Sequence, residues 1–416
     1  MQLKRVVVTG LGAVSPLGNS ASEYWKGLAA GQSGAGPITR FDAAKFRTRF
    51  ACEVKNFDPG TYLDRKEARK MDPFVHFAIA STDEAVKDSG ITPDIVDYNR
   101  VGVIWGSGIG GLLTFQEEVL NFGNGDGTPR FNPFFIPKMI VDSSAGLISI
   151  RHGFRGPNYC TVSACSSSNN SIIDAFTYLR TGRMQVCITG GSESAITIAG
   201  VGGFNALKAM SERNDEPEKA SRPYDKDRDG FVLGEGSAAI VLEEYEHALK
   251  RGAKIYCEIV GSGMSSDAYH ITAPHPDGIG FRLMLEDALS DAALKPEDID
   301  YINTHGTSTP LGDPLELTAI HDVFGDAAFR MNISSTKSMH GHLLGAAGAM
   351  EAAACIMAIQ HQKVPPTINL DNLDESIDPR FNLTPNKAQK RNIRYAMSNG
   401  FGFGGHNAAV VFKRMD

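Results

Sequence analysis

The chain has 416 residues, of which 42% are hydrophobic, so it can bury a large core in one or two domains. Its formal net charge of −7 argues against a dedicated nucleic-acid-binding protein. Six cysteines without a CxxC pair or disulfide-like spacing favour a reduced, cytoplasmic setting. The N-terminal apolar run is too short for a signal peptide. The most membrane-like stretch, 343–359, contains Glu351 and predicts a buried helix, so no membrane span is expected.

The first half predicts strands that alternate with helices. Val6–Val8 is expected to be a buried strand, with 10–18 as the turn that follows it. Further strands are expected at 101–105, 186–191 and 238–243, and helices at 20–28, 62–71, 74–88 and up to Lys250. The glycine cluster at 106–111 lacks the GK[ST] of a phosphate loop and a Rossmann acidic partner. It therefore predicts a close backbone approach to something buried.

One cysteine has a local sequence that favours reactivity. Small and β-branched residues lead into Cys165, and the serines at 166–168 offer N-cap oxygens for a following amphipathic helix. A helix N-terminus stabilises a thiolate, so Cys165 is expected to have a lowered pKa. The alternative is a buried structural cysteine, which is the commoner case.

The second half repeats the first. Three residues at matching positions, Asp88, Pro93 and Tyr98, recur 203 residues later as Asp291, Pro296 and Tyr301. In both places an amphipathic helix precedes the segment and a strand follows it. This predicts an α/β protein built from two similar halves.

Two histidines lie in glycine-rich turns of the second half. His305 follows a predicted strand and precedes Gly306, while His342 lies between a strand-like run and a helix start. With His340, the HxH spacing weakly permits a zinc site, although no further ligand lies near in the pattern. The other interpretation is nucleophilic catalysis by a cysteine and two histidines. Each histidine alone would more often be structural.

Four motifs in this order resemble the signatures of the β-ketoacyl-acyl-carrier-protein synthases, and the resemblance covers essentially the whole chain. The motifs are Ala164-Cys165-Ser166-Ser167, His305 to Asp313, Lys337 to Gly348, and Phe401 to Gly405. The length and the Gly108-Ile109-Gly110 turn resemble synthase II more than synthase I. The resemblance implies a thiolase fold, with five-stranded mixed sheets in α-β-α-β-α layers. It also implies a homodimer, and the halves are expected at 1–252 and 253–416.

The resemblance implies a decarboxylative condensation in fatty-acid elongation. Cys165 would take an acyl chain, and His305 and His342 would stabilise the enolate of a malonyl thioester. The backbone N–H groups of Cys165 and Phe403 would form the oxyanion hole. Lys337 and Glu351 would pair and orient the histidines.

Further residues match binding positions of the family. Thr307 and Thr309 would hold the pantetheine arm, and Phe403 would gate the acyl pocket. Ile109, Phe204 and Phe135 would line that pocket, with Phe135 near the partner subunit, although ordinary core packing is equally expected for these three. No cofactor or metal is expected on the enzyme, since the phosphopantetheine arrives on the carrier protein. A monovalent cation near Asn303, Glu351 and Ser398 is allowed by the resemblance alone.

A local basic cluster stands out on this acidic chain. Lys66, Arg69, Lys70 and Lys208 predict a docking patch for an acidic acyl carrier protein, with a solvated helix face as the alternative.

Two departures leave other functions open. His340 stands where small residues are common in synthase II, and 166–168 is Ser-Ser-Ser in place of Thr-Ser-Gly. These favour a ketosynthase of a type II polyketide or polyene pathway as the alternative. A non-catalytic chain-length subunit is disfavoured because Cys165 is present.

Overall fold

The computed structural model describes residues 3–415 and contains a ten-stranded sheet made of two five-stranded groups. The groups join where β1 (Val6–Val14) pairs with β8 (Cys257–Ser266) over three residues. The first group continues from β1 through β7 (Gly236–Glu244), β6 (Val186–Glu193), β4 (Val101–Gly106) and β5 (Asn158–Thr161). The second continues from β8 through β14 (His406–Lys413), β13 (Tyr395–Gly402), β9 (Tyr301–Asn303) and β10 (Asn332–Ser334).

The two groups have the same strand order and the same strand directions. In each group, the strand at the β1–β8 junction runs antiparallel to the second strand, and the second runs antiparallel to the third. The third, fourth and fifth strands run parallel to one another. The duplication predicted from the sequence repeat is therefore confirmed. The expected boundary at 252/253 falls between α9 (Tyr245–Lys250) and β8.

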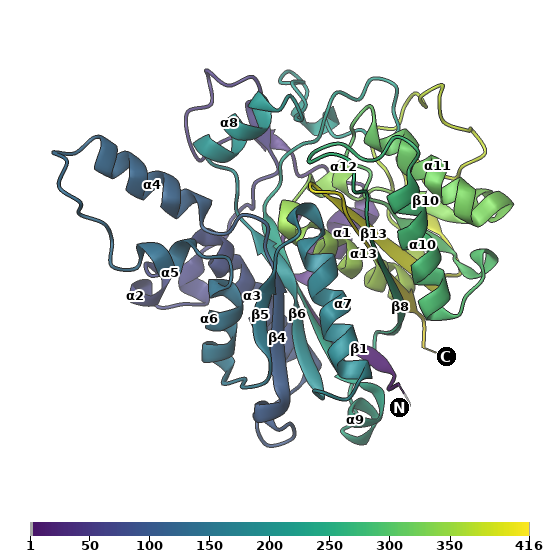
Figure 1. Ribbon diagram of the computed structural model, residues 1–416, viewed down its shortest axis with the longest axis horizontal. Coiled ribbons are helices and arrows are strands. Elements are labelled where there is room, and N and C mark those ends of the chain that lie inside the picture. The colour runs from purple at the N-terminus through teal and green to yellow at the C-terminus, as the bar shows by residue number, and fades with distance from the viewer. Residues whose placement is uncertain (1–2, 416) are drawn as a thin grey trace.

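Helices complete the layers (Figure 1). Outside the first group lies α3 (Pro73–Ser89), and outside the second lies α10 (Ile279–Ala292). Between the groups, α7 (Ser167–Arg180) packs against α13 (Ala347–His361). The largest hydrophobic cluster takes side chains from α7, α13 and the strands that face them. The predicted α-β-α-β-α arrangement is confirmed.

The turn expected at 10–18 is wrong at its start, because β1 continues to Val14. Gly10 and Gly12 are strand residues that allow α3 to lie directly on β1. A Cβ at Gly10 would clash with the carbonyl of Ala85, and one at Gly12 with that of Ser81. These glycines are thus explained by a tertiary contact and not by a local turn.

The buried helix expected near 343–359 is α13, which is almost wholly buried. Across residues 3–415, no helix is long and apolar enough to cross a membrane. The other α-helices of the described residues are α1 (Ala21–Ala30), α2 (Arg65–Ala68), α4 (Leu112–Gly123), α5 (Phe135–Met139), α6 (Ser143–His152), α8 (Ile198–Ala206), α11 (Gly312–Phe324) and α12 (Lys337–His340). The strands outside the large sheet are β2 (Gly36–Pro37), β3 (Phe50–Ala51), β11 (Lys363–Val364) and β12 (Gln389–Lys390).

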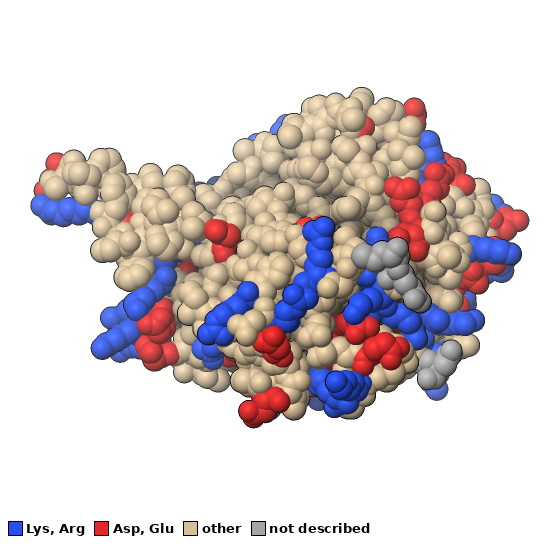
Figure 2. Space-filling model, turned by 60° about the horizontal axis from the view of Figure 1, so that its bottom comes forward, with Lys and Arg blue, Asp and Glu red and all other residues tan. Residues whose placement is uncertain are grey.

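An arm formed by α4, α5 and the loop between them projects from the body (Figure 1). Most of the arm surface visible in Figure 2 is uncharged, with charged residues at its tip. Its exposed side chains include many large hydrophobic ones: Phe115, Val119, Leu120, Phe122, Phe131, Phe134 and Ile136. Monomeric proteins seldom expose so much apolar surface in one place.

Candidate active site

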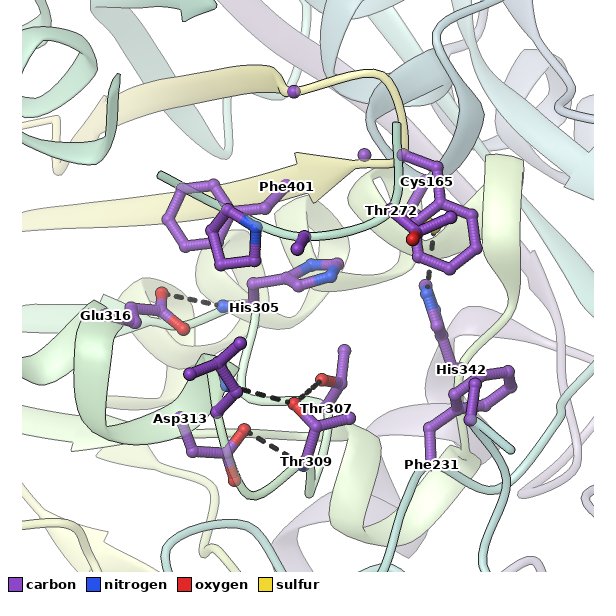
Figure 3. Close-up of a pocket in the computed structure, with 18 of the residues that line it drawn as sticks. Cys165, Phe231, Thr272, His305, Thr307, Thr309, Asp313, Glu316, His342 and Phe401 are labelled. Carbon is purple, nitrogen blue, oxygen red and sulfur yellow. Dashed lines mark hydrogen bonds between the residues drawn. The ribbon is translucent and has the colours of Figure 1, made fainter. Parts of the chain in front are cut away.

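Cys165 lies in a short 3₁₀ turn, Ala164–Ser166, that leads directly into α7. The preceding Ala164 has a φ of 51°, a conformation that L-residues seldom adopt and that often marks functional sites. The side chain is buried, and its Sγ lies 3.1 Å from Nε2 of His342 (Figure 3). The nucleophile predicted in the first half therefore contacts a histidine of the second half.

His342 and His305 share one wall of the site. The backbone N–H of His342 donates to the carbonyl of Val232 at 2.7 Å, which fixes the segment after α12. His305 follows β9, and its ring lies 5.3 Å from that of His342 and nearly perpendicular to it. Glu316 on α11 accepts the backbone N–H groups of His305 and Gly306, both at 2.9 Å. Both imidazoles are thus held from the backbone.

Lys337 sets the tautomer of His305. Its Nζ donates to Nδ1 of His305 at 3.3 Å and also forms a buried ion pair with Oε1 of Glu351. Because Nδ1 accepts a hydrogen bond, the proton of the neutral imidazole lies on Nε2. His305 is therefore a hydrogen-bond donor on the side away from Lys337.

Burial determines the charge state of the site. It lowers the pKa of His305 and of His342 well below 6.5, and Lys337 lowers both further, so both rings are neutral at pH 7. Burial also raises the pKa of Cys165 to about 11, although Lys337 and the N–H of Phe403 oppose this effect. The lowered pKa expected from the helix N-terminus is therefore wrong for the unliganded protein. Desolvation of the thiolate outweighs the helix end and the nearby cation.

The turn between β13 and β14 lies against the nucleophile. The backbone N–H of Phe403 lies near enough to the Cys165 sulfur to lower the pKa of the thiol. A Cβ on Gly402 would clash with the carbonyl of Ser163 and lie 3.2 Å from the Cys165 nitrogen. Only glycine allows this approach, which brings the turn that carries Phe403 against the backbone of Cys165.

A cavity of about 310 Å³ opens onto these groups. Of the residues expected in the site, it is lined by Cys165, His305, His342, Thr307, Thr309, Phe204, Phe403 and Lys208. The hydroxyls of Thr307 and Thr309 lie 3.1 Å apart on one wall (Figure 3). The structure thus brings together the residues expected to carry chemistry and those expected to hold the pantetheine arm.

The remaining residues expected for the acyl pocket and the docking patch do not line this cavity. Ile109 lines a second, apolar cavity of about 600 Å³. Phe135 is on the arm, where it stacks on Phe115 and Phe131. The three residues proposed for one acyl pocket are therefore not together within a single chain. Lys66, Arg69 and Lys70 lie on and just after α2, away from Lys208, and Lys70 also pairs with Glu67 at 2.7 Å.

One carboxylate of the site was not expected from the sequence. Glu316 was missed, although burial raises its pKa to about 7 and it holds the His305 turn. Glu351 Oε2, Ser398 Oγ and Asn399 Oδ1 are buried and have no hydrogen-bond partner within residues 3–415. Glu351 and Ser398 are two of the positions at which the resemblance allows a monovalent cation. In the same range, no cluster of three or more His, Cys, Asp or Glu side chains could hold a metal ion.

Comparison with known proteins decides the family. Residues 3–248 match the family model described as β-ketoacyl synthase, N-terminal domain, and residues 256–371 match the C-terminal domain. The chain belongs to the β-ketoacyl synthase family. Among curated members, it is 51% identical to 3-oxoacyl-[acyl-carrier-protein] synthase 2 of Coxiella burnetii, with both chains fully covered. It is 50% identical to the protein of the same name from Synechocystis, covering 100% of this chain and 99% of that one.

Solved structures of family members agree in fold. A β-ketoacyl synthase from Burkholderia phymatum superposes with a TM-score of 0.91 at 35% identity, covering 99% of this chain and all of that one. The ishigamide ketosynthase/chain length factor gives 0.91 at 34% identity, with full coverage of both. A type II PKS acyl-carrier protein in complex with its ketosynthase gives 0.89 at 30% identity, also with full coverage of both.

Proposed function

We propose that the protein is a 3-oxoacyl-acyl-carrier-protein synthase that elongates fatty acids by decarboxylative Claisen condensation. The observation that carries the proposal is the convergence of Cys165, His342 and His305 on one cavity, with Lys337 behind His305. The curated relatives at 46–51% identity over the full chain support the same reaction.

In the first half-reaction, Cys165 takes the acyl group from a carrier-protein thioester. As Sγ attacks the carbonyl carbon, its proton passes to Nε2 of His342, which lies 3.1 Å away. The N–H groups of Cys165 and Phe403 stabilise the tetrahedral oxyanion. When the carbon–sulfur bond to the pantetheine breaks, the leaving sulfur takes a proton from His342. The products are acyl-Cys165 and a free carrier thiol.

In the second half-reaction, a malonyl thioester occupies the same cavity. Its carbon–carboxylate bond breaks, carbon dioxide leaves, and the electron pair forms an enolate. Once Cys165 is acylated, Nε2 of His342 no longer faces a thiol proton, and the single proton of this neutral ring moves from Nδ1 to Nε2. The Nε2–H groups of His305 and His342 then both donate to the thioester oxygen, so negative charge develops opposite two donors in a dry site. The enolate carbon attacks the acyl-Cys165 carbonyl. The thiolate then leaves and takes a proton from solvent, releasing a 3-oxoacyl thioester two carbons longer.

We further propose how substrates reach the site. Thr307 and Thr309 bind the pantetheine arm at the cavity wall, and Phe403 gates the passage past Cys165. Lys208, exposed at the cavity mouth, belongs to a docking patch for the acidic carrier protein, with Lys66 and its basic neighbours as a second part.

The apolar arm supports a homodimer as the working form. A second subunit would cover its exposed aromatic side chains and close the cavity lined by Ile109. Phe135 would then lie at the subunit interface. We also propose the structural halves 1–252 and 253–416, and a cytoplasmic location supported by six cysteines that are all free.

A second candidate is a specialised ketosynthase of a type II polyketide or polyene pathway. The ishigamide and type II PKS neighbours, the serines at 166–168 and the buried His340 favour it. These two neighbours are 30–34% identical to the chain, against 46–51% for the curated 3-oxoacyl-acyl-carrier-protein synthases, so this candidate stands second to fatty-acid elongation.

The test is turnover by the purified protein with malonyl-carrier protein and a series of acyl-carrier proteins. Saturated acyl groups should yield carbon dioxide and 3-oxoacyl products two carbons longer. Turnover only with polyunsaturated or aryl starters would support the second candidate. No product with any starter would contradict both.

A further inference from the structure

Glu193, the last residue of β6, is fully buried and has no basic partner within salt-bridge distance among residues 3–415. Its carboxylate instead accepts five hydrogen bonds. Oε2 accepts from the N–H of Gly108 at 2.7 Å and of Gly345 at 3.0 Å. Oε1 accepts from the Ser107 hydroxyl and from the N–H groups of Ile109 and Gly110, each at 3.1 Å. Such an anion is stable in a dry site only while these donors remain in place.

The donors come from both halves of the chain and lie behind the nucleophile. The 108–110 turn follows β4 of the first half, and Gly345 lies three residues after His342 in the second. A Cβ on Gly108 would lie 2.9 Å from Glu193 Oε2 and 3.4 Å from the carbonyl of Ala164, the residue before Cys165. A Cβ on Gly345 would lie 2.7 Å from the same oxygen. The close approach predicted for the glycine cluster is thus in part an approach to Glu193, made by Gly108, while Gly106 lies against the start of α7 and Gly111 against Lys138 of α5.

We propose that Glu193 is a positioning residue that holds the Gly108–Gly110 turn and the His342–Gly345 segment together behind Cys165. It thereby sets the distance between Sγ of Cys165 and Nε2 of His342. It also fixes Ile109, so the wall of the second cavity and the catalytic histidine are held by one carboxylate. This inference extends the proposed condensation and depends on it for the kinetic test alone.

The charge of Glu193 has a separate consequence. It is one of the groups that raise the pKa of Cys165, while Lys337 lowers it. Removing the negative charge should therefore make the thiol easier to ionise, even as the altered geometry slows the reaction. Loss of a purely structural contact would not produce these two opposite effects.

The experiment compares three variants with the parent protein. In Glu193→Gln an amide N–H₂ faces backbone N–H donors, so kcat should fall about 10–10²-fold through misplacement of His342, with KM for either carrier substrate little changed. The pH midpoint for alkylation of Cys165 by iodoacetamide should move to lower pH. Gly345→Ala displaces the same segments but keeps the charge, so kcat should fall without this downward shift.

The matched control is Glu243→Gln. Glu243 is also a fully buried carboxylate, but its side-chain partners are His247 and Arg251, outside both clamped segments. It should leave kcat and the alkylation midpoint unchanged. The proposal is overturned if Glu193→Gln keeps the parent kcat, or if its midpoint does not move and its loss of kcat equals that of Glu243→Gln. Alkylation needs no carrier substrate, so failure of the proposed function would appear separately, as a parent protein that alkylates normally but forms no product.

Discussion

Replacing Lys337 by methionine separates the two half-reactions. The substitution keeps most of the side-chain volume but removes the donor to Nδ1 of His305, which lies 3.3 Å from Nζ. The proton of His305 is then free to move to Nδ1, and the donor facing the enolate is lost. Losing one such donor costs about 10²–10³ in rate, or about 2.7–4 kcal/mol. Carbon dioxide release from malonyl-carrier protein should fall by that factor, while acyl transfer to Cys165 should fall much less.

The same substitution leaves Glu351 buried without its ion-pair partner. Breaking a buried pair costs about 3–5 kcal/mol of stability. The double variant Lys337→Met, Glu351→Gln should therefore recover stability in urea unfolding without recovering carbon dioxide release. The assays are release of labelled carbon dioxide and intact-mass detection of the acyl-enzyme. The reasoning is refuted if both half-reactions fall equally in the double variant, or if decarboxylation keeps its parent rate.

Three further predictions concern pH, the pantetheine wall and the hairpin turn. Burial raises the pKa of Glu316 and Glu351 to about 7, so both gain protons as the pH falls through that value and carbon dioxide release should decline below it; a rate independent of pH in this range would contradict the assignment. Thr307→Val removes a hydroxyl whose hydrogen bond to the pantetheine arm contributes about 1 kcal/mol of binding free energy. In steady-state assays KM for both carrier substrates should therefore rise about fivefold while kcat is preserved. An unchanged KM would show that Thr307 does not bind the arm. Gly402→Ala should slow acyl-enzyme formation about 10²-fold by displacing the N–H group that stabilises the oxyanion. In the control variant Gly146→Ala the new Cβ meets nothing within 4 Å, so the rate of acyl-enzyme formation should not change. Equal rates for the two variants would argue against the close approach of Gly402 to the Cys165 backbone.

The sequence was informative wherever one short segment determines the structure. The repeat between Asp88–Tyr98 and Asp291–Tyr301 predicted the duplicated halves. In both places an α-helix ends at the start of the repeated segment, and a 3₁₀ turn and a strand come after it. The helix expected at 20–28 and the helix after Cys165 were also predictable, because periodicity is a local property. The serine capping expected for the second helix is wrong, since Ser166 at its N-cap makes no side-chain capping hydrogen bond.

Properties that depend on packing between segments distant in the sequence could not be predicted from the sequence. Gly10 and Gly12 looked like turn residues, but α3 lies on them. The helix position of Cys165 predicted a lowered thiol pKa, whereas burial, which no local pattern reports, raises it. No sequence pattern around Glu193 indicated its buried hydrogen-bond network. Its five donors come from turns more than 80 residues away in the first half and about 150 residues away in the second.

The central claim is that Cys165 carries the acyl group while the paired histidines of the other half drive decarboxylation. The most direct measurement is a time course of intact mass after mixing the protein with acyl-carrier protein and then malonyl-carrier protein. The account predicts one acyl adduct on Cys165, which disappears as an equal amount of carbon dioxide and 3-oxoacyl product forms. An adduct that also forms in Cys165→Ala, or product released while the adduct remains, would contradict it.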